Sequence, residues 1–506
     1  MAQSHSHSDG EDDASRAAQQ AQKQGRAAQW FPLSTKEGFS QWWTGASPMA
    51  TEHRVLSFIP HLQQPPTQTQ TGSGRCSKST TDLSAPPETS EAHTTTDALT
   101  DPYGPRRWNS EIVELSGKGR ALNEFSVERV GEEVEDTLVM LHGYGAGLGF
   151  YYRNFEALSR SAGWKVYALD LLGMGRSSRP SFKIHAKDRE GKITEAENWF
   201  IDALEEWRIK RGIERFTLLG HSLGGYLATA YALKYPGRLN KLILASPVGI
   251  PEDPHAVNDD IPDPEDSTMA NEFTQDQDET TDTPSNHRLA PTTAAKKDPP
   301  RRRVPPWLAY LWESNMISPF SLIRWSGPLG PRLVSGWTSR RFSQLPEEEA
   351  QALHDYSYSI FRQRGSSEYA LAYLLAPGAF ARSPLIRRIH GVGRQWIQPH
   401  DGAIVDGDAK PSSNDVKREP GLPVVFMYGE HDWMDVAGGF AAQEVMRKEK
   451  ERLLEGKSIE EKKKDHSEAK VVIINKAGHH VYLDGWEQFN EVMAKEMADV
   501  RAKRLA

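Results

Sequence analysis

The stretch Phe216-Thr-Leu-Leu-Gly-His-Ser-Leu-Gly-Gly225 decides the fold of this chain. Its apolar start predicts a buried strand over 216–219, and the residues after it predict a helix over 224–235. Between the two lies G-x-S-x-G, whose small residues let a chain turn sharply from strand to helix. Such a turn lifts the hydroxyl of Ser222 above the sheet and points the next backbone N–H at a reacting carbonyl. We therefore predict that Ser222 is a nucleophile; the alternative is a serine in a purely structural turn.

Apolar strands alternate with amphipathic helices on both sides of this turn. Parallel strands that are covered on both faces are continuous apolar runs, so the alternation predicts an α/β fold. We expect a mostly parallel sheet flanked by helices. The predicted strands are 112–115, 125–130, 137–141, 165–170, 216–219, 241–245, 422–428 and 471–474, and the main helices are 151–162, 198–210, 224–235, 441–468 and 485–505.

A serine nucleophile needs a base and an acid, which in this kind of site follow the serine in the order acid, then histidine. Asp432 lies just beyond the end of the strand 422–428, where an orienting carboxylate belongs, and Asp435 is the alternative. His479 follows the last strand directly after a glycine, and His480 is the alternative. The competing interpretation of either histidine is a loop residue satisfied by ordinary hydrogen bonds.

Two backbone N–H groups should stabilise the oxyanion. One is that of Leu223, and the other belongs to the glycine-rich loop His142–Gly149, where Tyr144 is the first choice and Gly145 the second. A nucleotide-binding loop is the rival interpretation, but the glycines do not fall as G-x-G-x-x-G and no Walker lysine follows. No pattern predicts a metal or a cofactor.

The chain divides by composition. Residues 1–105 read as largely disordered, except for an aromatic island at 30–43 that is either a surface anchor or a short helix packed on the core. The remaining units are a first half of the α/β core at 106–251, a disordered acidic insertion at 252–303, a helical lid at 304–390, a polar loop at 391–420 and a second half of the core at 421–506.

The lid begins with an apolar, aromatic stretch from Trp307 to Trp337, which includes Trp312 and Phe320 and has arginines beside it. Apolar residues next to cations are typical of segments that meet anionic lipid surfaces. We expect this stretch to face lipid; the alternative is that it packs inward as a cap.

Charge and cysteine content exclude several classes of protein. The 506 residues carry a formal net charge of −8, which argues against general nucleic-acid binding. Cys76 is the only cysteine, so a disulfide framework is excluded. No apolar run approaches the roughly 18–20 residues of a membrane-spanning helix. Residues 1–14 are polar and acidic and match neither a secretory nor a mitochondrial signal, although basic residues follow.

From about Trp108 onward the chain resembles the α/β-hydrolase fold. More narrowly it is similar to the lipid-acting subfamily of N-acyl phospholipid lipases, lipid-droplet lipase coactivators and the yeast cardiolipin-specific deacylase, and most like the fungal members. The resemblance is carried by 142–149, 205–207, 220–226, 234–236, 242–251 and Gly478-His479 with Asp484. It implies a serine hydrolase of phospholipid acyl esters, acting on cardiolipin or a lysophospholipid at a membrane surface.

The same resemblance implies alternatives. The coactivators lack the nucleophilic serine that this chain has at Ser222, and lysophosphatidic acid acyl transfer would use the same site. His479 and Asp484 form the H-x-x-x-x-D pattern read in this subfamily as an acyltransferase signature. We favour instead a helix cap, because Glu487 stands three residues after Asp484 as in a capping box. The implied compartment is the inner-membrane surface of the mitochondrion, with cytoplasm or lipid droplet as alternatives.

Overall fold

A computed structural model describes most of the α/β core and part of the segments around it. The described residues are 32–62, 93–95, 101–253, 256–257, 319–376, 379–397 and 417–505. Most of the predicted acidic insertion 252–303, the start of the lid and most of the polar loop 391–420 lie outside these residues.

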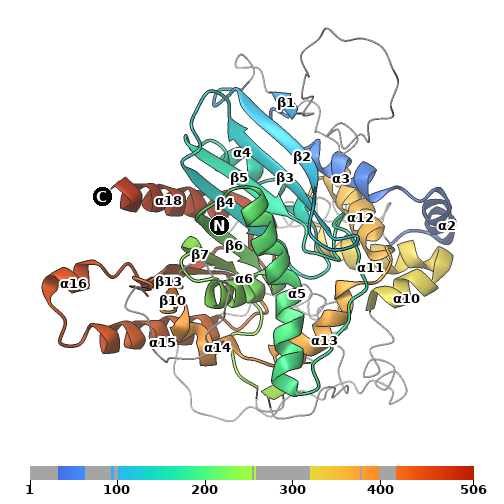
Figure 1. The fold of residues 1–506 in the computed structure, drawn as a ribbon. Coiled ribbons are helices and arrows are strands. Elements are labelled where there is room, and N and C mark those ends of the chain that lie inside the picture. The colour runs from blue at the N-terminus through green and yellow to red at the C-terminus, as the bar shows by residue number, and fades with distance from the viewer. Residues whose placement is uncertain are drawn as a thin grey trace, which may run out of the picture.

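One nine-stranded sheet forms the centre of the molecule, in the order β1-β2-β3-β5-β4-β6-β7-β12-β13 (Figure 1). The pairs from β5 through β13 are all parallel, whereas β1, β2, β3 and β5 pair antiparallel at one edge. The predicted α/β fold is therefore confirmed. The strands are β1 His93–Thr95, β2 Arg106–Glu114, β3 Ala121–Arg129, β4 Asp136–Leu141, β5 Trp164–Leu169, β6 Phe216–His221, β7 Leu239–Ala245, β12 Pro423–Gly429 and β13 Glu468–Ile474.

Helices flank the sheet on both sides. α5 (Arg189–Lys210) packs against α6 (Leu223–Lys234) on one side, and α4 (Phe155–Leu158) packs against α18 (Trp486–Leu505) on the other (Figure 1). All six residues of β4 and of β6 are buried. Burial on both faces explains why these strands are continuous apolar runs rather than alternating ones.

Two predicted helices differ from those observed. The predicted helix 441–468 is broken into α15 (Val436–Leu454) and α16 (Ile459–Lys463), with Gly456 at φ +71° between them. The predicted helix 151–162 is replaced by a 3₁₀ turn, η1 (Leu148–Tyr151), and the short α4. The left-handed backbone at Gly456 explains the first break, because glycine adopts such a φ far more readily than other residues.

A helical layer lies between β7 and β12 in sequence, where the lid was expected. It contains α10 (Pro319–Trp325), η2 (Gly327–Leu329), α11 (Gly330–Arg341), α12 (Glu347–Phe361), η3 (Ser367–Ala370), α13 (Leu371–Leu374), α14 (Leu385–Arg388) and η4 (Ile389–Gly391). Figure 1 shows α10, α11 and α12 together on one side of the sheet.

Residues 32–62, which contain most of the aromatic island predicted at 30–43, are largely helical. They form α2 (Thr35–Thr44) and α3 (Pro48–Leu56), which pack on η2, α11 and α12. Ser34 and Ser47 cap these helices, and Val55 and Leu56 are fully buried. These helices are polar, and they gain stability from contacts with the lid segment, which is distant in sequence.

Candidate active site

The strand–helix turn at Ser222 has the strained geometry that the motif predicts. Ser222 has φ 51° and ψ −118°, joins β6 to α6 and is 4% exposed. A Cβ on Gly220 would lie 2.2 Å from the carbonyl oxygen of Gly224, and one on Gly224 would lie 2.6 Å from that of His142. Only glycine fits at both positions, so these two residues permit the turn that presents the serine.

The structure brings His479 and Asp432 together. His479 Nδ1 lies 3.1 Å from Asp432 Oδ1, and the backbone N–H of Met434 donates to the same oxygen over 3.0 Å. Burial opposes ionisation of this carboxyl group, yet the hydrogen bond and charge of His479 hold its pKa below the ordinary value. Asp432 is thus a carboxylate that fixes the histidine tautomer with Nδ1–H.

The two alternatives have other partners. Asp435 caps α15, because its carboxylate accepts from the backbone N–H of Ala437 over 3.0 Å. His480 Nδ1 accepts from Arg341 Nε over 3.0 Å, and burial together with the charge of Arg341 holds its pKa well below the ordinary value. His480 is therefore a neutral imidazole that accepts a hydrogen bond from a lid arginine. The geometry favours Asp432 and His479 over both.

His221, the second residue of the G-x-S-x-G motif, contributes a contact that sequence reasoning missed. Its Nε2 lies 3.0 Å from the backbone carbonyl oxygen of His479, and the two rings are 4.8 Å apart. Burial keeps the pKa of His221 well below the ordinary value, so the ring is neutral and donates one hydrogen bond here. The turn at Ser222 is thereby joined to the backbone of His479.

The glycine-rich loop after β4 lies against Ser222. A Cβ on Gly143 would be 2.9 Å from the Cβ of Ser222, and Tyr144 and Gly145 come next in the loop. Leu223 is the first residue of α6, so its backbone N–H is at the helix end that has no intrahelical acceptor. The loop and the helix start thus flank Ser222, as an oxyanion site requires.

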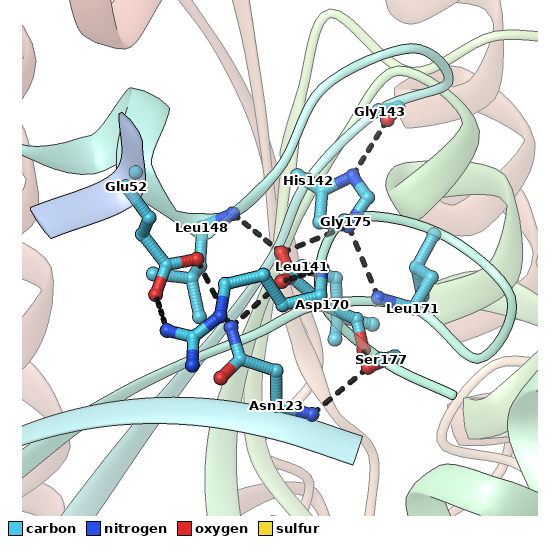
Figure 2. Close-up of polar contacts among 12 residues, drawn as sticks. Glu52, Asn123, Leu141, His142, Gly143, Leu148, Asp170, Leu171, Gly175 and Ser177 are labelled. Atoms are coloured by element: carbon cyan, nitrogen blue, oxygen red, sulfur yellow. Dashed lines mark hydrogen bonds and ion pairs between the residues drawn. The ribbon is translucent and has the colours of Figure 1, made fainter. Parts of the chain in front are cut away.

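Buried polar contacts fix the base of this loop (Figure 2). His142 Nδ1 lies 2.7 Å from the carbonyl oxygen of Gly143, while its Nε2 accepts from the backbone N–H of Leu171 over 3.0 Å. Farther along the loop, the backbone N–H of Leu148 donates to Asp170 Oδ1 over 2.7 Å. The loop is therefore anchored at both ends by the segment that follows β5.

The capping box predicted for Asp484 is wrong. Asp484 ends α17 (Val481–Asp484), and its Oδ2 accepts from the backbone N–H of Gly478 over 3.2 Å. Both of its oxygens also accept from Arg341, over 3.1 and 3.3 Å. A Cβ on Gly485 would lie 2.4 Å from Ile474, and this close approach separates α17 from α18. Asp484 thus links the lid to the residue before His479.

The family of this chain is shown by a family model that matches most of its α/β core. A family model described as the alpha/beta hydrolase fold matches residues 136–485. The chain belongs to the α/β-hydrolase family. The match includes the turn at Ser222, the loop after β4, and both Asp432 and His479.

Three relatives illustrate what this α/β hydrolase is similar to. It is 33% identical over 347 residues to a 1-acylglycerol-3-phosphate O-acyltransferase of Arabidopsis thaliana. The aligned part is 67% of this chain and 65% of that protein, so this chain spans slightly less than two thirds of that protein's length. It is 30% identical over 366 residues to the 1-acylglycerol-3-phosphate O-acyltransferase ABHD5 of Homo sapiens, covering 72% and 77%. It is 30% identical over 381 residues to a (Lyso)-N-acylphosphatidylethanolamine lipase of Mus musculus, covering 73% and 82%.

Two features are absent from the part of the chain that the structure describes. No helix among them is long and apolar enough to span a bilayer. Within the same residues, no group of three or more histidine, cysteine, aspartate or glutamate side chains is arranged to hold a metal ion.

The positions of the two aspartates lead to a testable difference. Asp432→Asn removes the carboxylate that holds His479, so labelling of Ser222 by a fluorophosphonate probe should slow by roughly 10³–10⁴-fold. Asp435→Asn should change the labelling rate by less than about threefold, because only a helix cap is altered. Gel-based labelling time courses measure both. Equal losses in the two variants would refute the assignment of Asp432.

Proposed function

We propose that this chain is a serine lipid hydrolase that cleaves acyl esters of phospholipids. The observation that carries the proposal is a serine on a strained strand–helix turn, whose neighbour His221 contacts the backbone of His479, which itself lies 3.1 Å from Asp432. The substrate class is supported by the names of the relatives, which describe an acyltransferase for an acylated glycerol phosphate and a lipase for an N-acyl phospholipid.

Each residue then has a defined step. Ser222 Oγ attacks the ester carbonyl while His479 takes its proton, and the developing oxyanion is stabilised by the N–H groups of Leu223 and Tyr144. The ester C–O bond breaks as His479 returns the proton to the leaving lysolipid alcohol. Water, activated by the same histidine, then cleaves the acyl-enzyme to a fatty acid and free Ser222. Asp432 holds the imidazole tautomer and stabilises its charged form throughout.

Cardiolipin or a lysophospholipid is the substrate we propose within this class. The stretch Tyr428–Met434 and the long insertions are the sequence features that favour cardiolipin, through their resemblance to the fungal members. The compartment proposed with it is the inner-membrane surface of the mitochondrion, with lipid droplet or cytoplasm as alternatives.

The direct test compares wild type with Ser222→Ala on cardiolipin and lysophospholipids, with released fatty acids quantified by mass spectrometry. The variant should lose roughly 10⁴–10⁶-fold in rate, the usual cost of removing a triad nucleophile. Circular dichroism provides the control for folding. Activity of the variant within tenfold of wild type would exclude a serine hydrolase, and so would wild-type inactivity on every lipid and on a short ester.

Acyl transfer is the second candidate, favoured by the acyltransferase names of two relatives. A lysolipid hydroxyl would replace water in the second step, with no change in the residues. The H-x-x-x-x-D pattern does not separate the reactions, because the carboxylate of Asp484 contacts Gly478 and Arg341. It supports the loop that carries His479, on which both reactions depend.

Replacement of Asp484 should therefore affect both reactions alike. We expect Asp484→Ala to lower hydrolysis and acyl transfer in parallel, by roughly 10–100-fold, because it releases the segment before His479 and misplaces the base. Parallel assays on one lysolipid acceptor, with water as the competing acceptor, measure the ratio of the two products. A loss of transfer with hydrolysis intact would instead identify Asp484 as an acceptor-binding residue.

We also propose that the enzyme works at a lipid surface, which α2 and the lid helices contact. Six large apolar side chains there are 48–74% exposed: Phe39, Trp43, Leu322, Trp325, Leu329 and Leu333. α2 is held to this layer by the close approach of Gly38 to Pro328 and by a 3.2 Å hydrogen bond from Arg332 to Thr35. Exposed apolar residues gathered from two segments are typical of an interfacial surface.

Part of the predicted lid surface faces inward instead. Phe320 is buried, and its ring stacks on Tyr144 at 5.1 Å and on Phe361 at 4.6 Å. It therefore covers the glycine-rich loop from the lid side. Trp307 and Trp312, which belong to the same predicted lipid-facing stretch, lie outside the described residues.

The surface can be tested by flotation on vesicles that contain anionic lipid. Trp43→Ser with Trp325→Ser should reduce vesicle binding at least tenfold, because two interfacial tryptophans are lost. Turnover of a short soluble ester should stay within twofold. Ile209→Ser, at a side chain 61% exposed on α5, is the matched control. Unchanged flotation of the double variant would contradict the proposed surface.

A further inference from the structure

Glu52 of α3 is a fully buried carboxylate that lies outside the residues matched by the family model. Its carboxyl group lies between β3, the segment after β5 and α12. Figure 2 shows it beside Asn123, near Asp170 and Leu148 at the base of the glycine-rich loop. Burying a charge is unfavourable unless hydrogen bonds and an opposite charge compensate for it. The partners of Glu52 therefore indicate what the residue does.

Three groups contact the Glu52 carboxylate. Arg176 Nη1 donates to Oε1 over 2.5 Å, Asn123 Nδ2 donates to Oε2 over 3.1 Å, and the Tyr356 hydroxyl donates to Oε2 over 3.3 Å. Asn123 and Tyr356 are fully buried, and the Arg176 side chain is 6% exposed. One residue of α3 thus joins β3, the turn after β5 and the lid helix α12.

Each partner of Glu52 is connected by hydrogen bonds to the glycine-rich loop. Asn123 Nδ2 also donates to Asp170 Oδ2 over 2.8 Å, and the backbone N–H of Arg176 donates to the same oxygen over 2.7 Å. Asp170 in turn accepts from Leu148 of the loop. The Tyr356 hydroxyl accepts from the backbone N–H of Gly149 over 3.3 Å. The hydrogen bonds from Leu148 and Gly149 therefore depend on groups that Glu52 holds.

There is little space for these groups to shift. A Cβ on Gly147 of the loop would lie 2.4 Å from the Tyr356 hydroxyl oxygen and 3.1 Å from Asp170 Oδ1. Displacing Tyr356 or Asp170 thus moves the loop backbone itself. The same loop contains Gly143, which touches Ser222, and Tyr144, the proposed oxyanion donor.

We propose that Glu52 is a positioning residue for the oxyanion loop, so that the amino-terminal helix α3 is an integral part of the active site. This inference rests on the proposed hydrolase function. Glu52 touches neither substrate nor Ser222, and acts through Asn123, Tyr356 and Arg176 on the loop that ends at Gly149.

Ionisation of Glu52 provides a specific readout. The charged and titratable groups that face it are Arg176 and Asp170, from the segment after β5, and Tyr356 from α12. Burial, opposed by Arg176 and reinforced by Asp170, raises the pKa of Glu52 to about 7. Above this pH the carboxylate pairs with Arg176, and below it the protonated group resembles a glutamine.

The experiment compares Glu52→Ala and Glu52→Gln in the full-length chain, with Val55→Ala as a control. Val55 is fully buried on the same helix, so its truncation loosens the packing of α3 but leaves the carboxylate in place. The measurements are kcat and KM on a short soluble ester, thermal stability, and hydrogen exchange of a peptide spanning 142–151.

Glu52→Ala should lower kcat at least tenfold with KM within threefold, and should speed exchange in the 142–151 peptide. Val55→Ala, compared at an equal loss of thermal stability, should keep kcat within twofold and leave that exchange unchanged. Glu52→Gln should retain more activity than Glu52→Ala. The ratio of wild-type to Glu52→Gln kcat should be largest at pH 8 and approach one at pH 5.5, because wild-type Glu52 becomes protonated.

Two kinds of failure can be told apart. Equal kcat losses in Glu52→Ala and Val55→Ala, with unchanged exchange in the loop, would overturn the positioning role. A wild-type protein without esterase activity would refute the proposed function, and the exchange data alone would then decide whether Glu52 orders the loop. If Glu52→Ala does not fold, the test rests on Glu52→Gln and on how the ratio of wild-type kcat to Glu52→Gln kcat changes with pH. A ratio that is the same at pH 5.5 and pH 8 would overturn the inference.

Discussion

The strained backbone at Ser222 is the constraint on which the rest of the site depends. A non-glycine residue at φ 51° persists only where its surroundings hold it. Here the turn is closed by backbone hydrogen bonds from Ser222 to Ala245, at 3.0 Å, and from Gly225 to Ser222, at 2.9 Å. Glycines on three sides let β6, α6 and the loop after β4 approach to van der Waals contact. Because the space is filled, small displacements of the loop reach the serine directly.

The central part of this arrangement was predictable from the sequence because it follows from local patterns. The run 216–219, the G-x-S-x-G turn and the strands before Asp432 and His479 each have a distinct signature. Parallel strands end at one edge of the sheet, so residues far apart in sequence meet there. The sequence left Asp432 and Asp435 as alternatives, since both follow the same strand. One contacts His479 and the other caps a helix.

The features that sequence reasoning missed all depend on contacts across long sequence distances. Glu52 reads as a surface residue on a polar helix until Asn123 and Tyr356 are placed around it. Asp484 matched a capping box, but the close approach of Gly485 to Ile474 breaks the helix there and turns the carboxylate toward Arg341. Phe320 belongs to an apolar stretch that lies partly on the surface and partly over the loop. Composition does not distinguish these environments.

Burial of Glu52 makes its ionised form, which the proposed role requires, unfavourable for stability. Its pKa of about 7 in the folded protein exceeds the ordinary 4.5, so the folded state binds this proton more tightly than the unfolded chain. The group therefore adds stability below about pH 4.5 and loses that contribution as pH rises through 7. The ion pair with Arg176 forms over the same rise in pH. An apolar residue would avoid this cost, so we attribute the carboxylate at this position to its proposed hold on the oxyanion loop rather than to stability.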